Sequence, residues 1–234
     1  MSYSSKDIRK PVPSLLGEAG KGLLFLLFPL LVLASCRSSE EADDSRHDWQ
    51  ERNALWFAEK YDSARVAIAE ARAAYPSGDE WQQHCEWRIF RTLLKSQDVD
   101  GPATDHVVCK IIKSGDGDWS AAYTDSVRLY YRGWIMDDDY PASKTNMTVF
   151  SQTYYGDFNE TTAAPVAFAT SSVVEGFMTA LQYMVKGDDW LIYVPQELGY
   201  KETSSSAIPA YSTLLYRVKI ELVHKSGTGM SEWR

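Results

Sequence analysis

The sequence predicts an α+β protein in which an antiparallel sheet wraps around one short helix and follows an N-terminal helical segment. Three observations support this fold class. Apolar residues of the range Asp48–Tyr75 recur at steps near three, four and seven, the spacing of an amphipathic helix. From His106 onward the chain carries short β-branched and aromatic runs between turns, which only Ser172–Val185 interrupts with a helical pattern. Several strands with one helix are typical of a sheet that has a helix on one face.

The first 35 residues have the pattern of an export signal. A segment with several basic residues precedes the apolar run Leu23–Ala34, which is shorter than the about 20 residues that cross a bilayer. The run ends in Leu33-Ala34-Ser35-Cys36, which resembles the lipobox of bacterial lipoproteins. This resemblance implies a signal peptide over residues 1–35, lipid attachment at Cys36 and a lipid-anchored protein of the bacterial cell envelope. The alternative is an ordinary cleavable signal with a chance cysteine.

The chain is acidic, with 32 Asp and Glu against 24 Lys and Arg and a net charge of −8. Because nucleic-acid binders need clustered Lys and Arg, no nucleic-acid partner is expected. Part of the acidity lies in residues 36–47, where Glu40-Glu41-Ala42-Asp43-Asp44 shows no apolar periodicity. We interpret this range as a solvated tether, although such a run also resembles the surface-export signal of some diderm bacteria. Membrane attachment would rest on acyl chains at Cys36 and not on basic surface.

Residues 48–98 are predicted to form the helical N-terminal segment. Its first helix, Asp48–Tyr75, is closed by Pro76-Ser77-Gly78. A second helical stretch is expected over Glu80–Lys95, because apolar residues recur there every four positions, at Trp81, Cys85, Ile89 and Leu93. Two interpretations stay open for this Trp-rich segment: a homodimerisation arm through residues 48–95, or packing onto the domain that follows.

The strand-rich domain is predicted over residues 103–225, after a linker that contains Gly101-Pro102 and before a tail over residues 226–234. Several of its runs alternate polar with apolar residues, as half-buried antiparallel strands do. Strands are expected at Val107–Lys113, Ser126–Ile135, Pro165–Ala169, Trp190–Val194 and Thr213–Val223.

Residues that usually carry metal or nucleophilic chemistry are not grouped in this sequence. The four histidines are scattered along the chain, so we expect neither a metal nor a cofactor. Asp137-Asp138-Asp139 lacks the pattern of a calcium loop and is interpreted as a solvated turn. Cys85 and Cys109 leave two interpretations open, a disulfide in an oxidising compartment or, for Cys109, a strand residue that fills the core.

One long resemblance covers about residues 106–223. The motifs of its first half are Ser114-Gly115-Asp116-Gly117, Val127-Arg128-Leu129-Tyr130-Tyr131-Arg132-Gly133, Phe150-Ser151-Gln152-Thr153, Pro165-Val166-Ala167-Phe168 and Val173-Val174-Glu175-Gly176-Phe177. Those of its second half are Val194-Pro195, Leu198-Gly199-Tyr200, Ile208-Pro209 and Thr213-Leu214-Leu215-Tyr216-Arg217-Val218. In this order and at these spacings, the motifs resemble the FKBP family of peptidyl-prolyl cis/trans isomerases.

The resemblance implies an FKBP-like fold and isomerase activity on proline-containing polypeptide clients, in the folding of exported proteins. Rotation about a prolyl bond breaks amide resonance against a barrier of ~20 kcal/mol, so a dry pocket shaped for the twisted amide suffices. The implied pocket walls are Tyr131, Phe150, Phe168, Val173, Phe177 and Tyr216. The implied hydrogen-bonding groups are the N–H of Val174 and the hydroxyls of Tyr200 and Ser151, and Ile208 would flank the site.

Three residues depart from the family pattern. Ser151 stands for an aspartate, Phe177 for a tryptophan and Lys201 for a glycine. Two stretches, Trp134–Val149 and Tyr154–Ala164, are longer than in the family and are expected to border the pocket. These departures keep a second function open, that of an FKBP-fold chaperone or protein-binding module of the cell envelope whose catalysis has weakened.

Overall fold

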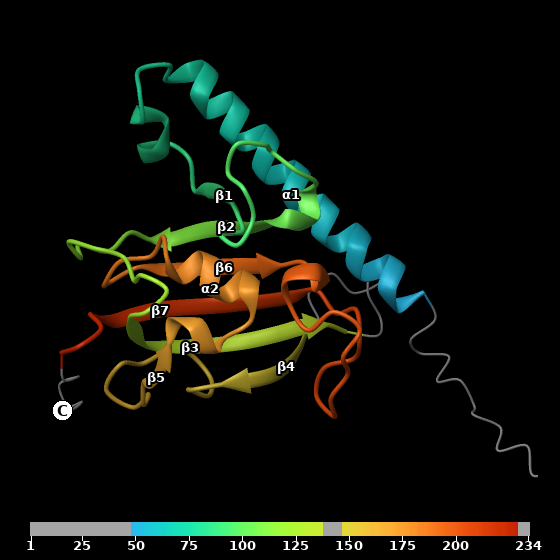
Figure 1. Ribbon diagram of the computed structural model, residues 1–234, viewed down its shortest axis with the longest axis vertical. Helices are drawn as coiled ribbons and strands as arrows, with labels where there is room; N and C mark the ends of the chain where they lie inside the picture. Colours follow the sequence, from blue (N-terminus) through green and yellow to red (C-terminus); the bar gives the residue numbers. More distant parts are fainter. Residues whose placement is uncertain (1–47, 138–146, 229–234) are drawn as a thin grey trace, which may run out of the picture. The chain divides into compact units, whose positions relative to one another are not determined.

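The computed structural model describes residues 48–137 and 147–228 (Figure 1). The predicted signal peptide, Cys36, the tether, Asp138-Asp139 and the end of the predicted tail lie outside these ranges. Within them, one antiparallel sheet has the strand order β1-β2-β6-β7-β3-β4, and β5 pairs with β3. The strands are β1 (Trp87–Arg91), β2 (His106–Lys113), β3 (Ser126–Met136), β4 (Met147–Gln152), β5 (Val166–Ala169), β6 (Asp189–Val194) and β7 (Leu214–His224).

The helix α2 (Glu175–Leu181) packs on one face of this sheet, which confirms the predicted fold class. Its residues from Gly176 to Leu181 are all buried. Glycine at position 176 allows the close approach, because a Cβ atom there would lie 2.4 Å from Cγ1 of Val194 on β6. The helix therefore rests directly on the strands whose ends border the site described below.

The helix α1 (Trp49–Ala74) confirms the first helix of the N-terminal segment, and it packs on the opposite face of the sheet. Trp56 meets Tyr193 of β6 edge to face, with ring centroids 6.0 Å apart. Trp190 of the same strand lies beside Phe90, whose ring stacks on Tyr183 just after α2. Residues three apart on a strand point to opposite faces, so α1 and α2 enclose the sheet between them. A homodimer through residues 48–95 stays a prediction.

The second predicted helix, Glu80–Lys95, is wrong. The range contains a short 3₁₀ helix at Glu80–Gln83 and then the strand β1, which pairs with β2 along its whole length. The helical pattern placed Leu93 on the buried stripe, yet Leu93 is 40% exposed, whereas Phe90 is stacked on Tyr183. The hydrogen bonds and packing that this segment gains on the edge of β2 outweigh its weak helical pattern, which has only one apolar residue per turn. Strands on both sides of the predicted linker therefore belong to the same sheet. The domain boundary at residues 98–103 stays a prediction.

The five strands predicted for the second domain are confirmed, and no end of a strand is displaced by more than one residue. The strand β4 was not predicted. The stretch Trp134–Val149 was predicted to be longer than the hairpin typical of the family. Its two ends form the β3–β4 hairpin, because Trp134 pairs with Val149 and Met136 with Met147. The stretch is therefore strand on both sides of the range 138–146.

Both cysteines in the described part of the chain, Cys85 and Cys109, are buried free thiols. Burial raises the pKa of the Cys109 thiol far above its usual range, and the charge of Arg88 offsets this only in part. Cys109 is thus a core residue of β2, as one of the two interpretations had it. Among the described residues, no helix combines the length and the hydropathy of a membrane span.

Candidate active site

A cavity of about 410 Å³ lies where α2, four strands and two loops converge. This volume is in the range of ~300–1,000 Å³ that small-molecule sites occupy. All ten pocket residues implied by the family resemblance line it, together with one that sequence reasoning missed, Ser172. The ten are Tyr131, Phe150, Ser151, Phe168, Val173, Val174, Phe177, Tyr200, Ile208 and Tyr216. Their placement around one cavity is a finding, and their roles stay predictions.

Two stacked rings line the most buried part of the cavity. Phe177 of α2 and Tyr216 of β7 have ring centroids 4.7 Å apart and planes inclined by only 10°. They are 3% and 4% exposed. Burial raises the pKa of Tyr216 well above its usual value, and the nearby hydroxyls of Tyr200 and Tyr131 raise it further. The phenol therefore stays neutral, and this part of the cavity carries no charge.

Three further aromatic side chains form the walls around this pair. Phe150 meets the face of Tyr216 edge on, with centroids 5.5 Å apart and planes at 85°. Tyr131 meets Phe168 in a similar way at 5.9 Å and 65°. Edge-to-face contacts of this kind fix ring orientation and contribute about 0.5–1.5 kcal/mol each beyond the area they bury. The cavity is thus a box of aromatic faces, which suits a flat or cyclic apolar group such as a proline ring.

Ser151 provides a hydrogen-bond partner for the hydroxyl of Tyr131. The two oxygen atoms lie 2.5 Å apart, across the pairing of β3 with β4. In the family pattern an aspartate stands at this position, so the serine retains a partner for the tyrosine but supplies no negative charge. The hydrogen bond to Ser151 fixes the orientation of the Tyr131 hydroxyl. The site lacks the negative charge that the aspartate supplies in the family pattern.

Glycine at position 133 makes room for the ring of Phe150. A Cβ atom on Gly133 would lie 2.6 Å from Cζ of Phe150 and 3.0 Å from two further ring carbons. Because glycine has no side chain, the phenyl ring of β4 lies directly over the backbone of β3. The glycine that closes the motif Val127–Gly133 thus has a steric role in shaping the cavity.

The loop between β6 and β7 carries Tyr200 and Ile208. Tyr200 is 41% exposed and stands at the rim, whereas Ile208 is 7% exposed. Ser205 fixes this turn, because its N–H donates to the carbonyl of Ile208 at 2.8 Å and its hydroxyl accepts from the N–H of Ile208 at 3.1 Å. Sequence reasoning missed Ser205, although serine is among the residues whose side chains hydrogen-bond the backbone of a turn.

Lys201, which follows Tyr200, adopts a backbone conformation that favours glycine. Its φ is +56°, in the left-handed region. The N–H of Lys201 donates to Gln196 at 3.0 Å, and its carbonyl accepts from Tyr211 at 2.6 Å. These two hydrogen bonds hold the loop closed although a lysine costs about 1 kcal/mol more than glycine in this conformation. The departure from the family's glycine therefore leaves the turn in place under local strain.

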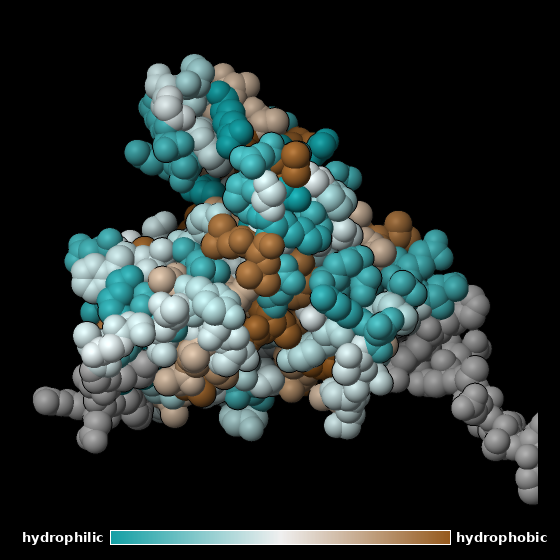
Figure 2. Space-filling view, in the orientation of Figure 1, coloured by the Kyte–Doolittle hydropathy of each residue, from teal (hydrophilic) through white to brown (hydrophobic). Residues whose placement is uncertain are grey.

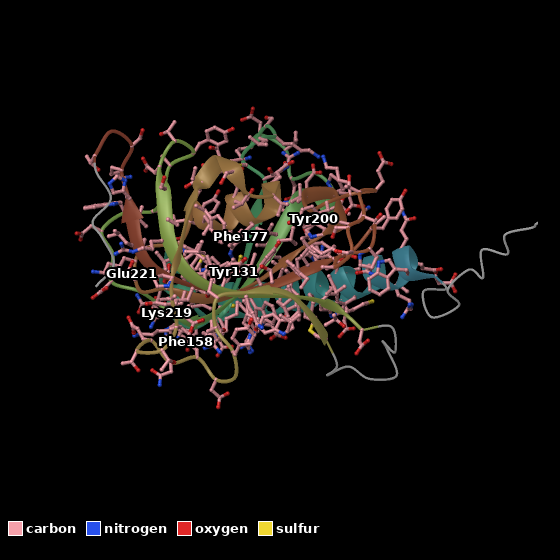
Figure 3. All side chains as sticks on the ribbon, turned by 90° about the horizontal axis from the view of Figure 1, so that it is seen from below. Tyr131, Phe158, Phe177, Tyr200, Lys219 and Glu221 are labelled. Carbon is pink, nitrogen blue, oxygen red and sulfur yellow. The ribbon has the colours of Figure 1, made fainter. Side chains whose placement is uncertain are left out.

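The insertion Tyr154–Ala164 does not border the cavity, which corrects the prediction. Phe158 packs edge on against Tyr130 and Tyr154, each at a centroid distance of 5.1 Å, and the ammonium of Lys219 lies 4.7 Å above its ring. Neighbouring strand residues point to opposite faces, so the partners of Tyr130 lie across the sheet from those of Tyr131. Figure 3 shows this separation: Tyr131, Phe177 and Tyr200 lie above, and Phe158 and Lys219 lie below.

A larger hollow of about 1060 Å³ lies elsewhere, between α1 and β1. Arginine and aromatic side chains line it, among them Arg72 and Arg88, which lie over the ring of Trp81 at 4.5 and 5.0 Å. None of the ten pocket residues belongs to it. Apolar surface is also visible below α1 on the face shown in Figure 2.

In the described ranges, no group of three or more His, Cys, Asp or Glu side chains is arranged to hold a metal ion.

Comparisons with known proteins agree with this geometry. Residues 117–221 match the family model of FKBP-type peptidyl-prolyl cis-trans isomerase. The FKBP-type 22 kDa peptidyl-prolyl cis-trans isomerase of Escherichia coli is 33% identical over 112 residues, which is 47% of each chain. The macrophage infectivity potentiator of Trypanosoma cruzi is 29% identical over 65% of this chain and 72% of its own. The outer membrane protein MIP of Legionella longbeachae is 30% identical over 50% of this chain and 44% of its own.

The chain spans about half the length of two of these relatives, those of Escherichia coli and Legionella longbeachae. The family match begins at residue 117 and ends at residue 221, and so includes all ten pocket residues. It leaves out α1 and β1.

Proposed function

We propose that the chain, whose residues 117–221 match the FKBP family model, is an active peptidyl-prolyl cis/trans isomerase of this family. The observation that carries this proposal is the aromatic cavity in which Phe177 and Tyr216 stack at 4.7 Å and the other family positions surround them. No covalent intermediate is needed, because the barrier of ~20 kcal/mol arises from lost amide resonance.

The cavity supports this reaction by binding the twisted amide better than the planar one. A proline ring would rest between Phe177, Tyr216 and the walls Tyr131 and Phe168. The planar amide is strongly dipolar and is stabilised by water, so transfer into an uncharged aromatic site favours the less polar twisted form. The N–H of Val174, just before α2, and the hydroxyl of Tyr200 at the rim would bind the flanking substrate carbonyls and hold the peptide in register.

A refolding assay limited by prolyl isomerisation tests this function. The chain from residue 37 to 234 is expected to accelerate refolding of such a client. Tyr200→Phe removes one hydroxyl and is expected to lower kcat/KM by about tenfold, the effect of one lost hydrogen bond of ~1.4 kcal/mol. Phe168→Ala removes an aromatic wall that contacts Tyr131 and is expected to lower kcat/KM by at least as much. If both variants match the parent, the site assignment is wrong.

A second function, that of a binding or chaperone module with weakened catalysis, is favoured by one observation. Ser151 supplies a neutral partner to Tyr131 where the family has a charged one. Under this alternative the same assay gives no acceleration of refolding, while aggregation of the unfolded client is still suppressed. The two functions thus predict opposite outcomes for the refolding rate.

We further propose that this protein works in the bacterial cell envelope on exported clients and is anchored by lipid at Cys36. The apolar run before Cys36 supports the proposal, and one relative is named an outer membrane protein. Incorporation of a labelled fatty acid tests the anchor. The parent is expected to take up label and sediment with membranes, and Cys36→Ala is expected to do neither. A labelled Cys36→Ala variant would contradict the attachment site.

A further inference from the structure

The loop between β6 and β7 is held at its far end by α1, a helix outside the family match. This loop contributes Tyr200 and Ile208 to the cavity and ends at Thr213, three residues before Tyr216. Its last two residues, Ser212 and Thr213, are 3% and 1% exposed. Both residues form hydrogen bonds with the first two turns of α1.

Asn53 of α1 binds Thr213 through two hydrogen bonds. The side-chain oxygen of Asn53 accepts from the backbone N–H of Thr213 at 2.7 Å, and the backbone carbonyl of Asn53 accepts from the Thr213 hydroxyl at 3.1 Å. The amide nitrogen of Asn53 donates to the carbonyl of Trp49 at 2.8 Å, which fixes the orientation of the side chain. Asn53 is 0% exposed, so water cannot replace these bonds if the side chain is lost.

Trp49 extends this link toward Ile208. Its indole N–H donates to the hydroxyl of Ser212 at 3.2 Å, and that hydroxyl donates to the carbonyl of Pro209 at 2.7 Å. Pro209 directly follows Ile208, which lines the cavity. A continuous series of hydrogen bonds thus runs from the start of α1 to Pro209, the residue next to the cavity wall.

A second link reaches the cavity from the end of β1. The hydroxyl of Thr92, which is 0% exposed, donates to a carboxylate oxygen of Glu175 at 2.6 Å. Glu175 is the first residue of α2 and follows Val174, a cavity residue. The N-terminal segment therefore holds the surroundings of the cavity at two separate places, the end of the β6–β7 loop and the start of α2.

We propose that Asn53 is a positioning residue for the isomerase site and that Thr92 assists it from the other side. The inference rests on the proposed isomerase function. Tyr200 at the rim depends on the path of its loop, and Asn53 sets where that loop enters β7. A displacement of about 1 Å at a catalytic group can lower a rate by as much as 10²-fold, so loss of this anchor lowers activity without unfolding the domain.

The test compares two buried substitutions in α1 of the full chain. Asn53→Leu keeps the branching at Cγ and removes the polar groups that bind Thr213, while Trp56→Leu weakens the packing on Tyr193 of β6. The measurements are Tm, kcat/KM for an X-Pro peptide below both Tm values, and amide hydrogen exchange of residues 199–213. Asn53→Leu is expected to lower kcat/KM by about tenfold and to speed exchange in the loop. Trp56→Leu is expected to lower Tm and to leave kcat/KM within about twofold.

Two further variants sharpen the test. Asn53→Asp keeps an acceptor for the Thr213 N–H and is expected to recover part of the activity, which also covers the case in which Asn53→Leu fails to fold. Thr92→Val keeps the shape, removes the bond to Glu175 and is expected to lower kcat/KM by a few-fold. Equal loss of kcat/KM and of Tm in Asn53→Leu and Trp56→Leu would overturn the positioning role, as would unchanged loop exchange in Asn53→Leu. A parent without isomerase activity overturns the proposed function instead, and hydrogen exchange then still decides the role of Asn53.

Discussion

The ring of Phe177 lies flat on the ring of Tyr216, with centroids 4.7 Å apart. This contact joins α2 to β7 and lines the deepest part of the cavity, so the same pair of rings links the core of the domain to its site. The family pattern has a larger indole at position 177. The smaller phenyl ring keeps the stacked geometry, which explains how an aromatic cavity forms here without the tryptophan.

Replacing Phe177 with leucine tests whether activity depends on the flat aromatic ring or only on the apolar volume of the side chain. Phe177→Leu is expected to lower kcat/KM about five- to tenfold, because a branched side chain cannot present a face to a proline ring. The free energy of unfolding should fall by about 1–2 kcal/mol through the lost stacking and imperfect filling. Met178→Leu is the matched control, since Met178 is 3% exposed on the same helix but does not line the cavity. Equal activity in the two variants would contradict the role of the ring.

If the proposed isomerase function holds, substitutions at Ser151 test whether the neutral site limits catalysis. Ser151→Ala leaves the Tyr131 hydroxyl without its partner at 2.5 Å, and kcat/KM is expected to fall several-fold. Ser151→Asp restores the family's charged acceptor, which binds a tyrosine hydroxyl more strongly, and kcat/KM is expected to exceed that of the parent. The peptide isomerase assay measures both. An aspartate variant that is no faster than the parent would show that the serine is not what limits the rate.

The strands and the cavity could be predicted because each depends on short, ordered motifs. Tyr131 and Phe168 come from neighbouring strands and Phe177 from the helix that follows, so their meeting follows from the fold once the family pattern is recognised. The order of residues along a strand also predicts which face each one uses. Chain order alone, however, did not reveal that the Tyr154–Ala164 insertion packs against Tyr130, across the sheet from the cavity.

The errors arise where distant parts of the chain determine local structure. Residues 87–91 have a spacing compatible with a helix, and only the open edge of β2 selects a strand there. Asn53 was missed for a related reason. A single asparagine in an amphipathic helix gives no sign of a buried partner, and its partner Thr213 lies 160 residues away.

Lys201 offers a direct measure of backbone strain beside the site. Because its φ is +56°, Lys201→Gly removes a steric cost of about 1 kcal/mol in the folded state, offset in part by the greater freedom of glycine in the unfolded chain. We expect the free energy of unfolding to rise by about 0.5 kcal/mol. Glu202→Gly, one residue on and without a positive φ, is expected to lower it by a similar amount. Urea denaturation of the two variants measures the sign of each change in unfolding free energy. A loss of stability in Lys201→Gly would contradict the proposal that the backbone is strained at Lys201.

Two buried aspartates predict opposite effects of pH on stability. Asp125 is 4% exposed and accepts from the N–H groups of Ala122 and Ser226 at 2.9 and 2.8 Å. These two hydrogen bonds are the main cause that lowers its pKa, and Lys225 contributes. Asp188 is also 4% exposed, and there burial outweighs the N–H bonds from Val185 and Gly115 and raises the pKa.

The sign of each effect follows from which state binds more protons. For Asp125 the unfolded state binds more, so its contribution is complete above the unfolded pKa of about 3.9 and is lost as pH falls through the lower folded pKa. The difference in unfolding free energy between parent and Asp125→Asn should therefore shrink below about pH 4. For Asp188 the folded state binds more, so the difference between parent and Asp188→Asn should shrink as pH rises above about 4. Urea denaturation from pH 3 to pH 7 measures both slopes, and equal signs for the two variants would refute the assignment of one of them.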